Sequence, residues 1–225
     1  MDHLQHHILL FDLDGTLTDS EPGIINSVRH ALHAFGMDRP PETLRSFIGP
    51  PLYNSFRQVI GLSEADTIKA IEVYRTYFAE KGIYENALYP GISDLLHRLQ
   101  HQGKRLVVAT SKPEIFARKI IAYFDLDSCF DAVCGADLEG KRSSKSDVIR
   151  YALDTCGIAS DAKADAIMIG DRCYDILGAR DNGLEAVGVL YGYGSREELR
   201  QAGAVHFAES VQELGQLLCS TNQPI

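Results

Sequence analysis

The segment ILLFDLDGTLTDS, residues 8–20, joins a short apolar run directly to two acidic residues, Asp12 and Asp14. We predict a buried strand over His7 to Phe11, because a strand covered on both faces of a parallel sheet is continuously apolar. Ligands of open α/β sheets bind beyond the carboxyl ends of the strands. Two positions apart in extended chain, both carboxylates point the same way, toward the expected binding crevice.

Further apolar runs along the chain alternate with amphipathic stretches of helical period. The predicted strands are Lys104 to Thr110, Asp131 to Cys134, Ala164 to Ile169 and Leu184 to Leu190, with a last one near Val205. The predicted helices are Ser93 to Gln102, Glu114 to Phe124, Lys145 to Cys156, Tyr174 to Asn182 and Ser210 to Leu218. This alternation with short turns predicts an α/β fold, a doubly wound parallel sheet.

One region departs from this rhythm. Between residues 21 and 84 only helical periodicity is found, over Ile24 to Phe35, Leu52 to Ile60 and Ala65 to Glu80. We therefore expect a helical cap at 21–84, inserted after the first strand, and a core made of residues 1–20 and 85–225. An insertion at this place is a candidate lid over the crevice.

A second acidic pair occurs in IGDRCYD, residues 169–175. Asp171 falls at a predicted strand end and Asp175 in the first turn of the following helix. Either pair alone has an ordinary alternative, a helix cap or a turn. Four carboxylates meeting at adjoining strand ends would repel one another, and hard oxygen ligands in such a place suit Mg²⁺.

Possible counter-charges lie at the same edge of the predicted sheet. The run KRLVVATSK ends in Thr110, Ser111 and Lys112, and Lys145 begins another predicted helix. Hydroxyls, a lysine, a helix N-terminus and Mg²⁺ together describe a site for phosphoryl groups. The alternatives are a strand-end hydroxyl for Thr110 and a solvated helix start for Lys145.

Composition excludes several classes of protein. The chain has 225 residues and a net charge of -9, which disfavours a nucleic acid polymer as partner. No apolar run approaches the roughly 18 residues of a membrane span, and no signal peptide is recognised. Five cysteines without CxxC spacing suit reduced thiols, so we expect a cytoplasmic protein. For His3, His6 and His7 we expect a frayed polar terminus rather than a metal site.

The motifs resemble those of the haloacid dehalogenase superfamily. The match comprises DLDGT at residues 12–16, Thr110, Lys145 and Gly170-Asp171 with Asp175, in that order along nearly the whole chain. The helical insertion is similar to that of phosphoglycolate phosphatases, small-molecule 5'-nucleotidases and beta-phosphoglucomutases. FIGPPL at 47–52 and ATSKPE at 109–114 look most like the first two groups. The resemblance implies a Rossmann-like core with a helical cap and a phosphoric monoester hydrolase.

The same resemblance implies residue roles. Asp12 would be the nucleophile that forms an aspartyl-phosphate, and Asp14 the general acid and base. Mg²⁺ would be held by the Asp12 carboxylate, the Asp14 backbone carbonyl and Asp171, with Asp175 ordering its surroundings. Thr110 and Lys145 would hold the phosphoryl oxygens. The residues expected to contact the substrate in the core are Thr16, Ser111 and Lys112. In the insertion, which should choose the substrate, Arg45 is a candidate contact, and a solvated helix face is its alternative.

Some alternatives stay open. GKRSSKSD, residues 140–147, lacks the Lys-Pro-x-Pro-Asp string of many relatives, so Lys141 rivals Lys145, and Arg142 is a further candidate phosphate contact. The expected substrate is a small phosphorylated metabolite, phosphoglycolate or a nucleoside 5'-monophosphate. The rival functions are a beta-phosphoglucomutase-like enzyme and a non-catalytic sensor of phosphorylated ligands. A monomer and a homodimer are both compatible with the sequence.

Overall fold

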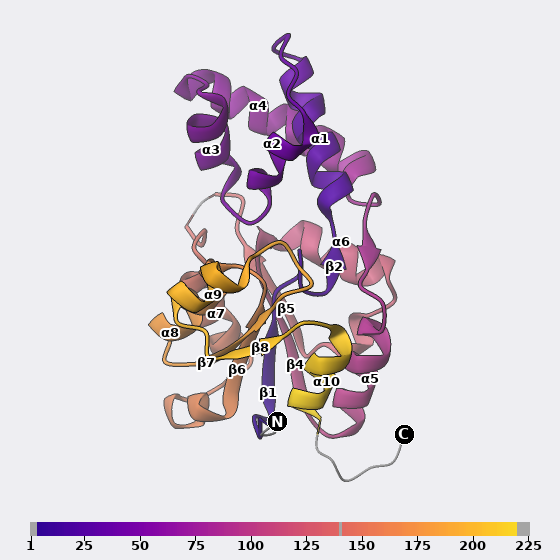
Figure 1. The fold of residues 1–225 in the computed structure, drawn as a ribbon, viewed down its shortest axis with the longest axis vertical. Coiled ribbons are helices and arrows are strands. Elements are labelled where there is room, and N and C mark those ends of the chain that lie inside the picture. Colours follow the sequence, from indigo (N-terminus) through magenta and orange to yellow (C-terminus); the bar gives the residue numbers. More distant parts are fainter. Residues whose placement is uncertain (1–3, 140, 220–225) are drawn as a thin grey trace. The chain divides into compact units, whose positions relative to one another are not determined.

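The computed structural model describes residues 4–139 and 141–219. The chain divides into two compact units, one made of Met1–Thr18 with Leu88–Ile225 and the other of Asp19–Ala87. We call them the core unit and the helical unit, and Figure 1 shows the elements of each. A separate two-stranded sheet is formed by β2 (Thr18–Asp19) and β3 (Ala87–Leu88).

The core unit is built on a six-stranded sheet in the order β5-β4-β1-β6-β7-β8, in which every pairing is parallel. Its strands are β1 (Ile8–Phe11), β4 (Arg105–Pro113), β5 (Ala132–Ala136), β6 (Ala166–Gly170), β7 (Glu185–Val189) and β8 (His206–Ala208). β1 is buried throughout, as its continuous apolar sequence predicts. The predicted α/β class with a parallel sheet is confirmed.

Helices cover both faces of this sheet (Figure 1). They are α5 (Ile92–His101), α6 (Glu114–Tyr123), α7 (Lys145–Thr155), α8 (Cys173–Asp181), α9 (Arg196–Ala202) and α10 (Val211–Leu218). One face packs on α7, α8 and α9 through a cluster that includes Leu10, Met168 and Ile149. α5 and α6 pack on β4, and α10 packs on α5. The chain reverses direction across the sheet after β5, which makes the fold doubly wound.

Two features of the core unit differ from the predictions. β4 continues past Thr110 to Pro113, because the pairing with β5 resumes at Pro113↔Ala136 after a shift in register. The helix α9 was not predicted, although Ser195 caps it by accepting from the Glu198 N–H and Gly203 ends it at φ 108°.

The helical unit contains α1 (Glu21–His33), α2 (Pro41–Leu44), α3 (Leu52–Ser55) and α4 (Glu64–Tyr77), with a 3-10 turn at Arg45–Phe47. Its core includes a T-shaped pair of Phe47 and Phe56, with ring centroids 5.0 Å apart. The continuous helices predicted through Ile60 and Glu80 are wrong in detail. α3 and α4 run into wider π-helical turns at Phe56–Ile60 and Phe78–Gly82.

Residues 4–7 are held in place by contacts within the core unit, so the expectation of a frayed terminus is wrong for His6 and His7. The Leu4 N–H donates to the Leu217 carbonyl, and His7 Nδ1 lies 3.0 Å from Asp165 Oδ1. His6 Nε2 lies 3.7 Å from a Glu185 carboxylate oxygen. His3 lies outside the described residues.

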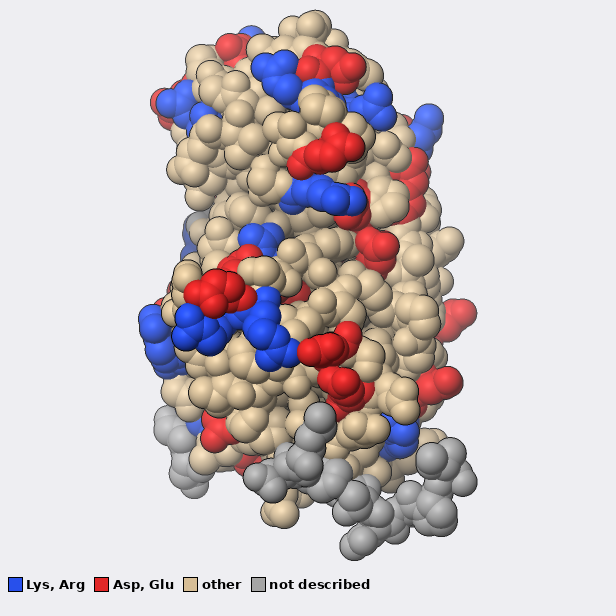
Figure 2. Space-filling model, in the orientation of Figure 1, with Lys and Arg blue, Asp and Glu red and all other residues tan. Residues whose placement is uncertain are grey.

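Several charged side chains on the surface of the core unit form ion pairs. Near α9, Figure 2 shows basic and acidic side chains side by side. The ion pairs formed by residues of this helix include Arg200 with Glu197 at 2.9 Å and Arg172 with Glu198 at 2.9 Å. Among the helices that the structure describes, none is both long and apolar enough to cross a membrane.

Candidate active site

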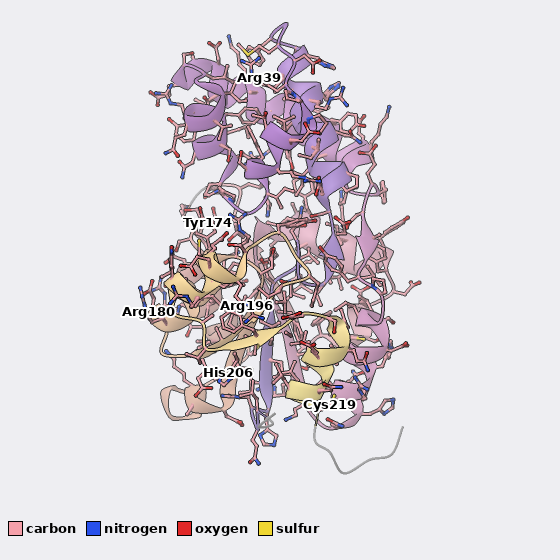
Figure 3. The ribbon with its side chains drawn as sticks, viewed as in Figure 1. Arg39, Tyr174, Arg180, Arg196, His206 and Cys219 are labelled. Atoms are coloured by element: carbon pink, nitrogen blue, oxygen red, sulfur yellow. The ribbon has the colours of Figure 1, made fainter. Side chains whose placement is uncertain are left out.

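Three carboxylates from distant parts of the sequence meet at the carboxyl ends of β1 and β6. The two strands are neighbours, with Phe11 opposite Ile169, so the residues that follow them emerge side by side. Oxygens of Asp12, Asp171 and Asp175 lie within 4.8 Å of one another, and all three residues are buried. Two oxygens on opposite sides of one Mg²⁺ stand about 4.2 Å apart, so this spacing suits a single ion. Figure 3 shows Tyr174, which precedes Asp175 in the sequence, toward the end of the core unit where the strands have their carboxyl ends. His206 lies further toward the opposite end of the core unit.

Local backbone contacts fix two of these carboxylates. Asp12 Oδ1 accepts a hydrogen bond from the Leu13 N–H at 2.8 Å. Asp175 Oδ2 accepts from the Arg172 N–H at 3.0 Å, and the Asp175 N–H donates to the Arg172 carbonyl, so both bonds fix Asp175 at the start of α8. A Cβ on Gly170 would overlap the Asp175 carboxyl group, so glycine is required where β6 ends.

Lys145 is the cation of this cluster. Its side chain is 3% exposed, and Nζ lies 2.8 Å from Asp12 Oδ1 and 2.7 Å from Asp175 Oδ1. Nζ also donates to the Ala109 carbonyl at 3.1 Å, so the ammonium group lies among two carboxylates and a carbonyl oxygen. Burial opposes the charge on Lys145, but the two carboxylates outweigh it and raise the pKa of the ammonium group.

The three carboxylates carry more negative charge than one lysine neutralises. Burial raises the pKa of Asp171 well above its usual value, and Asp175 and Asp12 add to the rise. Burial also raises the pKa of Asp175, to about 6, despite the opposing charge of Lys145. Buried carboxylates in excess of their counter-charges are satisfied by a bound cation, so the donor set fits a divalent metal ion such as Mg²⁺.

Asp14 lies at the same strand end, beside Lys112 rather than within the metal-ligand cluster. Its Oδ2 is 3.1 Å from Lys112 Nζ, and both side chains are largely buried. Asp14 Oδ1 is buried and has no hydrogen-bond partner among the described residues. A buried oxygen without a partner is costly, and a bound ligand that carries a proton or a donor would satisfy it.

The predicted substrate contacts of the core unit lie on two elements, the strand β4 and the loop after β1. Thr110 is 1% exposed, and its Oγ1 accepts from the Lys112 N–H at 3.2 Å. Ser111 and Lys112 belong to β4 itself rather than to a loop after it. Thr16 is fully buried, and its Oγ1 donates to Asp171 Oδ1 at 3.4 Å, so its hydroxyl faces the carboxylate cluster.

Three other candidates have their contacts elsewhere. Arg45 belongs to the helical unit, where its guanidinium lies 2.7 Å from Glu21. Lys141, the rival of Lys145, is 81% exposed and pairs with Glu139. The Arg142 guanidinium donates to the Gly135 carbonyl at 2.7 Å, so it braces the end of β5.

Sequence reasoning missed the segment after β7, Tyr191–Gly194, which we call the YGYG segment. The Tyr193 N–H donates to Asp171 Oδ2 at 2.8 Å, and the Tyr191 hydroxyl donates to the Thr16 carbonyl at 3.0 Å. Burial raises the pKa of Tyr191, so this hydroxyl keeps its proton. The sequence feature that could have identified the YGYG segment is a glycine-rich turn directly after an apolar strand.

Comparison with known proteins places this geometry in a family. The model of the haloacid dehalogenase-like hydrolases matches residues 9–189. A 5'-nucleotidase of Pseudomonas aeruginosa is 44% identical over 216 residues, which cover 96% of each chain. The tyrosine-protein kinase PtkA of Mycobacterium tuberculosis is 38% identical over 214 residues, which are 94% of this chain and 72% of the relative.

Solved structures agree with the sequence comparison. The crystal structure of a "predicted phosphatase" from Clostridium acetobutylicum superposes with a TM-score of 0.89 at 48% identity, covering 95% of this chain and 98% of that one. The structure of PtkA gives a TM-score of 0.82 at 37% identity, covering 94% and 97%. The chain therefore belongs to the haloacid dehalogenase-like hydrolase family, as a phosphoric monoester hydrolase.

Proposed function

We propose that this protein is a Mg²⁺-dependent phosphatase that hydrolyses small phosphomonoesters through an aspartyl-phosphate on Asp12. The observation that carries the proposal is the buried cluster of Asp12, Asp171 and Asp175 around Lys145. Membership of a hydrolase family supports the same function, and so does the Asp14 oxygen that has no hydrogen-bond partner in the described part of the chain.

In this proposal the Asp12 carboxylate attacks the phosphorus atom, and the ester oxygen leaves. The described contacts of Asp12, from the Leu13 N–H and Lys145, both fall on Oδ1. They hold the carboxylate in one orientation and leave Oδ2 for the attack on phosphorus. Lys145 donates one hydrogen bond, to the Ala109 carbonyl, and in this proposal it would donate another to a phosphoryl oxygen.

Asp14 is proposed as the proton donor and acceptor. Protonated, it would give its proton to the departing alkoxide, and as a carboxylate it would then take a proton from the water that hydrolyses the aspartyl-phosphate. The Lys112 ammonium at 3.1 Å fixes the Asp14 carboxyl group and leaves Oδ1 available for this exchange.

Asp12 and Asp171 would hold Mg²⁺, together with the Asp14 carbonyl, and Asp175 would orient Lys145 and the start of α8. When bound, Mg²⁺ neutralises negative charge that develops on the transferring phosphoryl group. Thr110, on the neighbouring strand β4, would donate its hydroxyl proton to a phosphoryl oxygen.

For the substrate we propose a nucleoside 5'-monophosphate, with phosphoglycolate as the second candidate. A relative named 5'-nucleotidase is 44% identical, whereas a phosphoglycolate phosphatase of Colwellia psychrerythraea is 26% identical. We propose the helical unit as the cap that selects the leaving group, with Arg45 as a contact. We further propose a cytoplasmic location, which the five free thiols support.

The test is a panel of phosphomonoesters assayed for release of inorganic phosphate, with Mg²⁺ and with EDTA. The panel contains nucleoside 5'-monophosphates, phosphoglycolate, hexose phosphates and phosphotyrosine, the last because one relative is named a tyrosine-protein kinase. We expect phosphate release that requires Mg²⁺ and disappears in Asp12→Asn. No release from any ester would refute the proposal.

The same panel separates the two rival functions. A beta-phosphoglucomutase-like enzyme would interconvert hexose phosphates and release little phosphate. A non-catalytic sensor would bind esters without turnover, and Asp12→Asn would then change nothing in the assay.

A further inference from the structure

The loop after β7 reaches the carboxylate cluster from a third strand. β7 is the neighbour of β6, so the YGYG segment emerges beside Asp171 at the carboxyl ends of the strands. Two of its glycines are required for this approach. A Cβ on Gly192 would overlap the carbonyl of Gly15 and the Asp171 side chain, and a Cβ on Gly194 would overlap the Asp171 carbonyl.

The segment engages Asp171 on one oxygen and, through Thr16, on the other. The Tyr193 N–H donates to Asp171 Oδ2 at 2.8 Å, and Thr16 Oγ1 donates to Asp171 Oδ1 at 3.4 Å. The Tyr191 hydroxyl donates to the Thr16 carbonyl at 3.0 Å. Both carboxylate oxygens of Asp171 are thus oriented by groups that the YGYG segment itself supplies or holds.

Packing fixes the tyrosine that anchors this arrangement. The Tyr191 ring meets the Tyr89 ring edge to face, with centroids 5.0 Å apart. The Tyr89 N–H in turn donates to the Leu17 carbonyl at 3.1 Å, in the same loop as Thr16. Tyr191 is therefore joined to the loop after β1 both by its hydroxyl and through its ring partner.

We propose that the YGYG segment is a positioning element of the active site, and that Tyr191 and Thr16 are its positioning residues. By holding the loop after β1 against Asp171, the segment sets the affinity of the carboxylate cluster for a divalent cation. The inference rests on the proposed metal-dependent function. Groups that orient a metal ligand typically change metal affinity by about 10- to 100-fold when removed.

The test uses the whole protein and Mn²⁺ as a probe, with binding followed by electron paramagnetic resonance. Tyr191→Phe removes only the hydroxyl that reaches Thr16, and we expect Mn²⁺ to bind about tenfold more weakly. Tyr123→Phe removes a hydroxyl from a half-exposed ring on α6 and should bind Mn²⁺ like the wild type. The melting temperature in EDTA should differ little among the three proteins.

A second pair of variants keeps the proposal testable if Tyr191→Phe folds poorly. Thr16→Val removes the donor to Asp171 at nearly constant volume and should weaken Mn²⁺ binding, whereas Thr16→Ser keeps the hydroxyl and should restore it. If Tyr191 and Thr16 act through one chain of contacts, their effects should not multiply. The double variant Thr16→Val/Tyr191→Phe should then lose less Mn²⁺ affinity than the product of the two single fold-losses.

Mn²⁺ affinities of Tyr191→Phe and Thr16→Val equal to that of the wild type would overturn the proposal, and so would a wild type that binds no Mn²⁺. Because this measurement needs no substrate, a protein that binds Mn²⁺ but hydrolyses no ester would refute the proposed function alone. In an active enzyme, the Mg²⁺ concentration for half-maximal activity should rise in Tyr191→Phe while kcat at saturating Mg²⁺ changes less.

Discussion

Binding of Mg²⁺ to the carboxylate cluster should weaken as the pH falls from about 8 to about 5. A carboxylate must lose its proton before it can coordinate a metal ion, and an ionised carboxylate beside the ion strengthens its binding, so the pKa values of the ligand Asp171 and of its neighbour Asp175 set the pH range of binding. Burial raises the pKa of Asp175 to about 6, and burial together with the charges of Asp175 and Asp12 raises the pKa of Asp171 well above its usual value.

The magnitude follows from Asp175 alone. One pH unit below its pKa, this carboxyl group is about ten-to-one protonated, so Mg²⁺ that binds beside the ionised form of Asp175 should bind up to about tenfold more weakly at about pH 5. Asp171 adds to the loss because its pKa is also raised. Calorimetric titration of the wild type with Mg²⁺ at both pH values, in buffers of different ionisation heat, gives the affinity and the protons released.

The raised pKa of Asp175 also makes the metal-free protein less stable as the pH rises. An aspartate in the unfolded chain has a pKa of about 3.9. Below that pH Asp175 is uncharged in both the folded and the unfolded state, so it does not destabilise the folded protein. Above its folded pKa of about 6 the penalty is complete, and the free energy of unfolding of the metal-free protein is lower by about 3 kcal/mol. Mg²⁺ should therefore raise the unfolding midpoint in urea more at about pH 8 than at about pH 5.

Two variants separate this explanation from a general effect of pH. Asp175→Asn has no proton to lose at that position and should show a smaller change of Mg²⁺ affinity with pH than the wild type. Asp154→Asn, at an exposed acid of α7, should show the full change. Equal wild-type affinities at the two pH values, or binding without proton release, would refute the reasoning.

Three further predictions concern single side chains. Asp12→Asn should lower phosphate release at least about a thousandfold while the circular dichroism spectrum is retained, and substantial residual turnover would remove Asp12 as nucleophile. Lys145→Met should lower the free energy of unfolding of the metal-free protein by about 3–5 kcal/mol, since it leaves buried carboxylates without their cation. Lys141→Met, at an exposed lysine, should stay within about 0.5 kcal/mol in the same urea titration, and equal losses would contradict the assignment of Lys145. Arg45→Ala should raise KM more than it lowers kcat in steady-state assays, and no change in either would end its role as a substrate contact.

The strand ends that carry the acids could be predicted because burial and chemistry leave a local pattern. An apolar run followed at once by Asp12 or Asp171 identifies the carboxyl end of a buried strand without further information. The helical turns could be placed less well. Nothing in the local pattern of Phe56–Ile60 distinguishes a π-helical turn from an α-helix, because both present the same side chains at nearly the same spacing.

The neighbourhood of Asp12 and Asp171 depends on strand order rather than on local pattern. β1 and β6 are separated by more than 150 positions, and only the reversal of the chain after β5 brings them together in the sheet. A doubly wound topology predicts that such a reversal exists, and ligand sites are found at the place where it occurs. The convergence of the acids could therefore be expected as a consequence of the fold class, while the partners of each oxygen could not.

The YGYG segment was missed because its contribution comes from the backbone and from the absence of side chains. Tyr193 reaches Asp171 through an N–H that every residue except proline possesses, and Gly192 and Gly194 act by leaving room. Such a role has no characteristic residue chemistry, whereas a carboxylate pair does. The acids of this site could be predicted from their chemistry, whereas the loop that contacts Asp171 has the sequence of an ordinary tight turn. Strand ends next to a predicted site should therefore be searched for glycine pairs as closely as for acids.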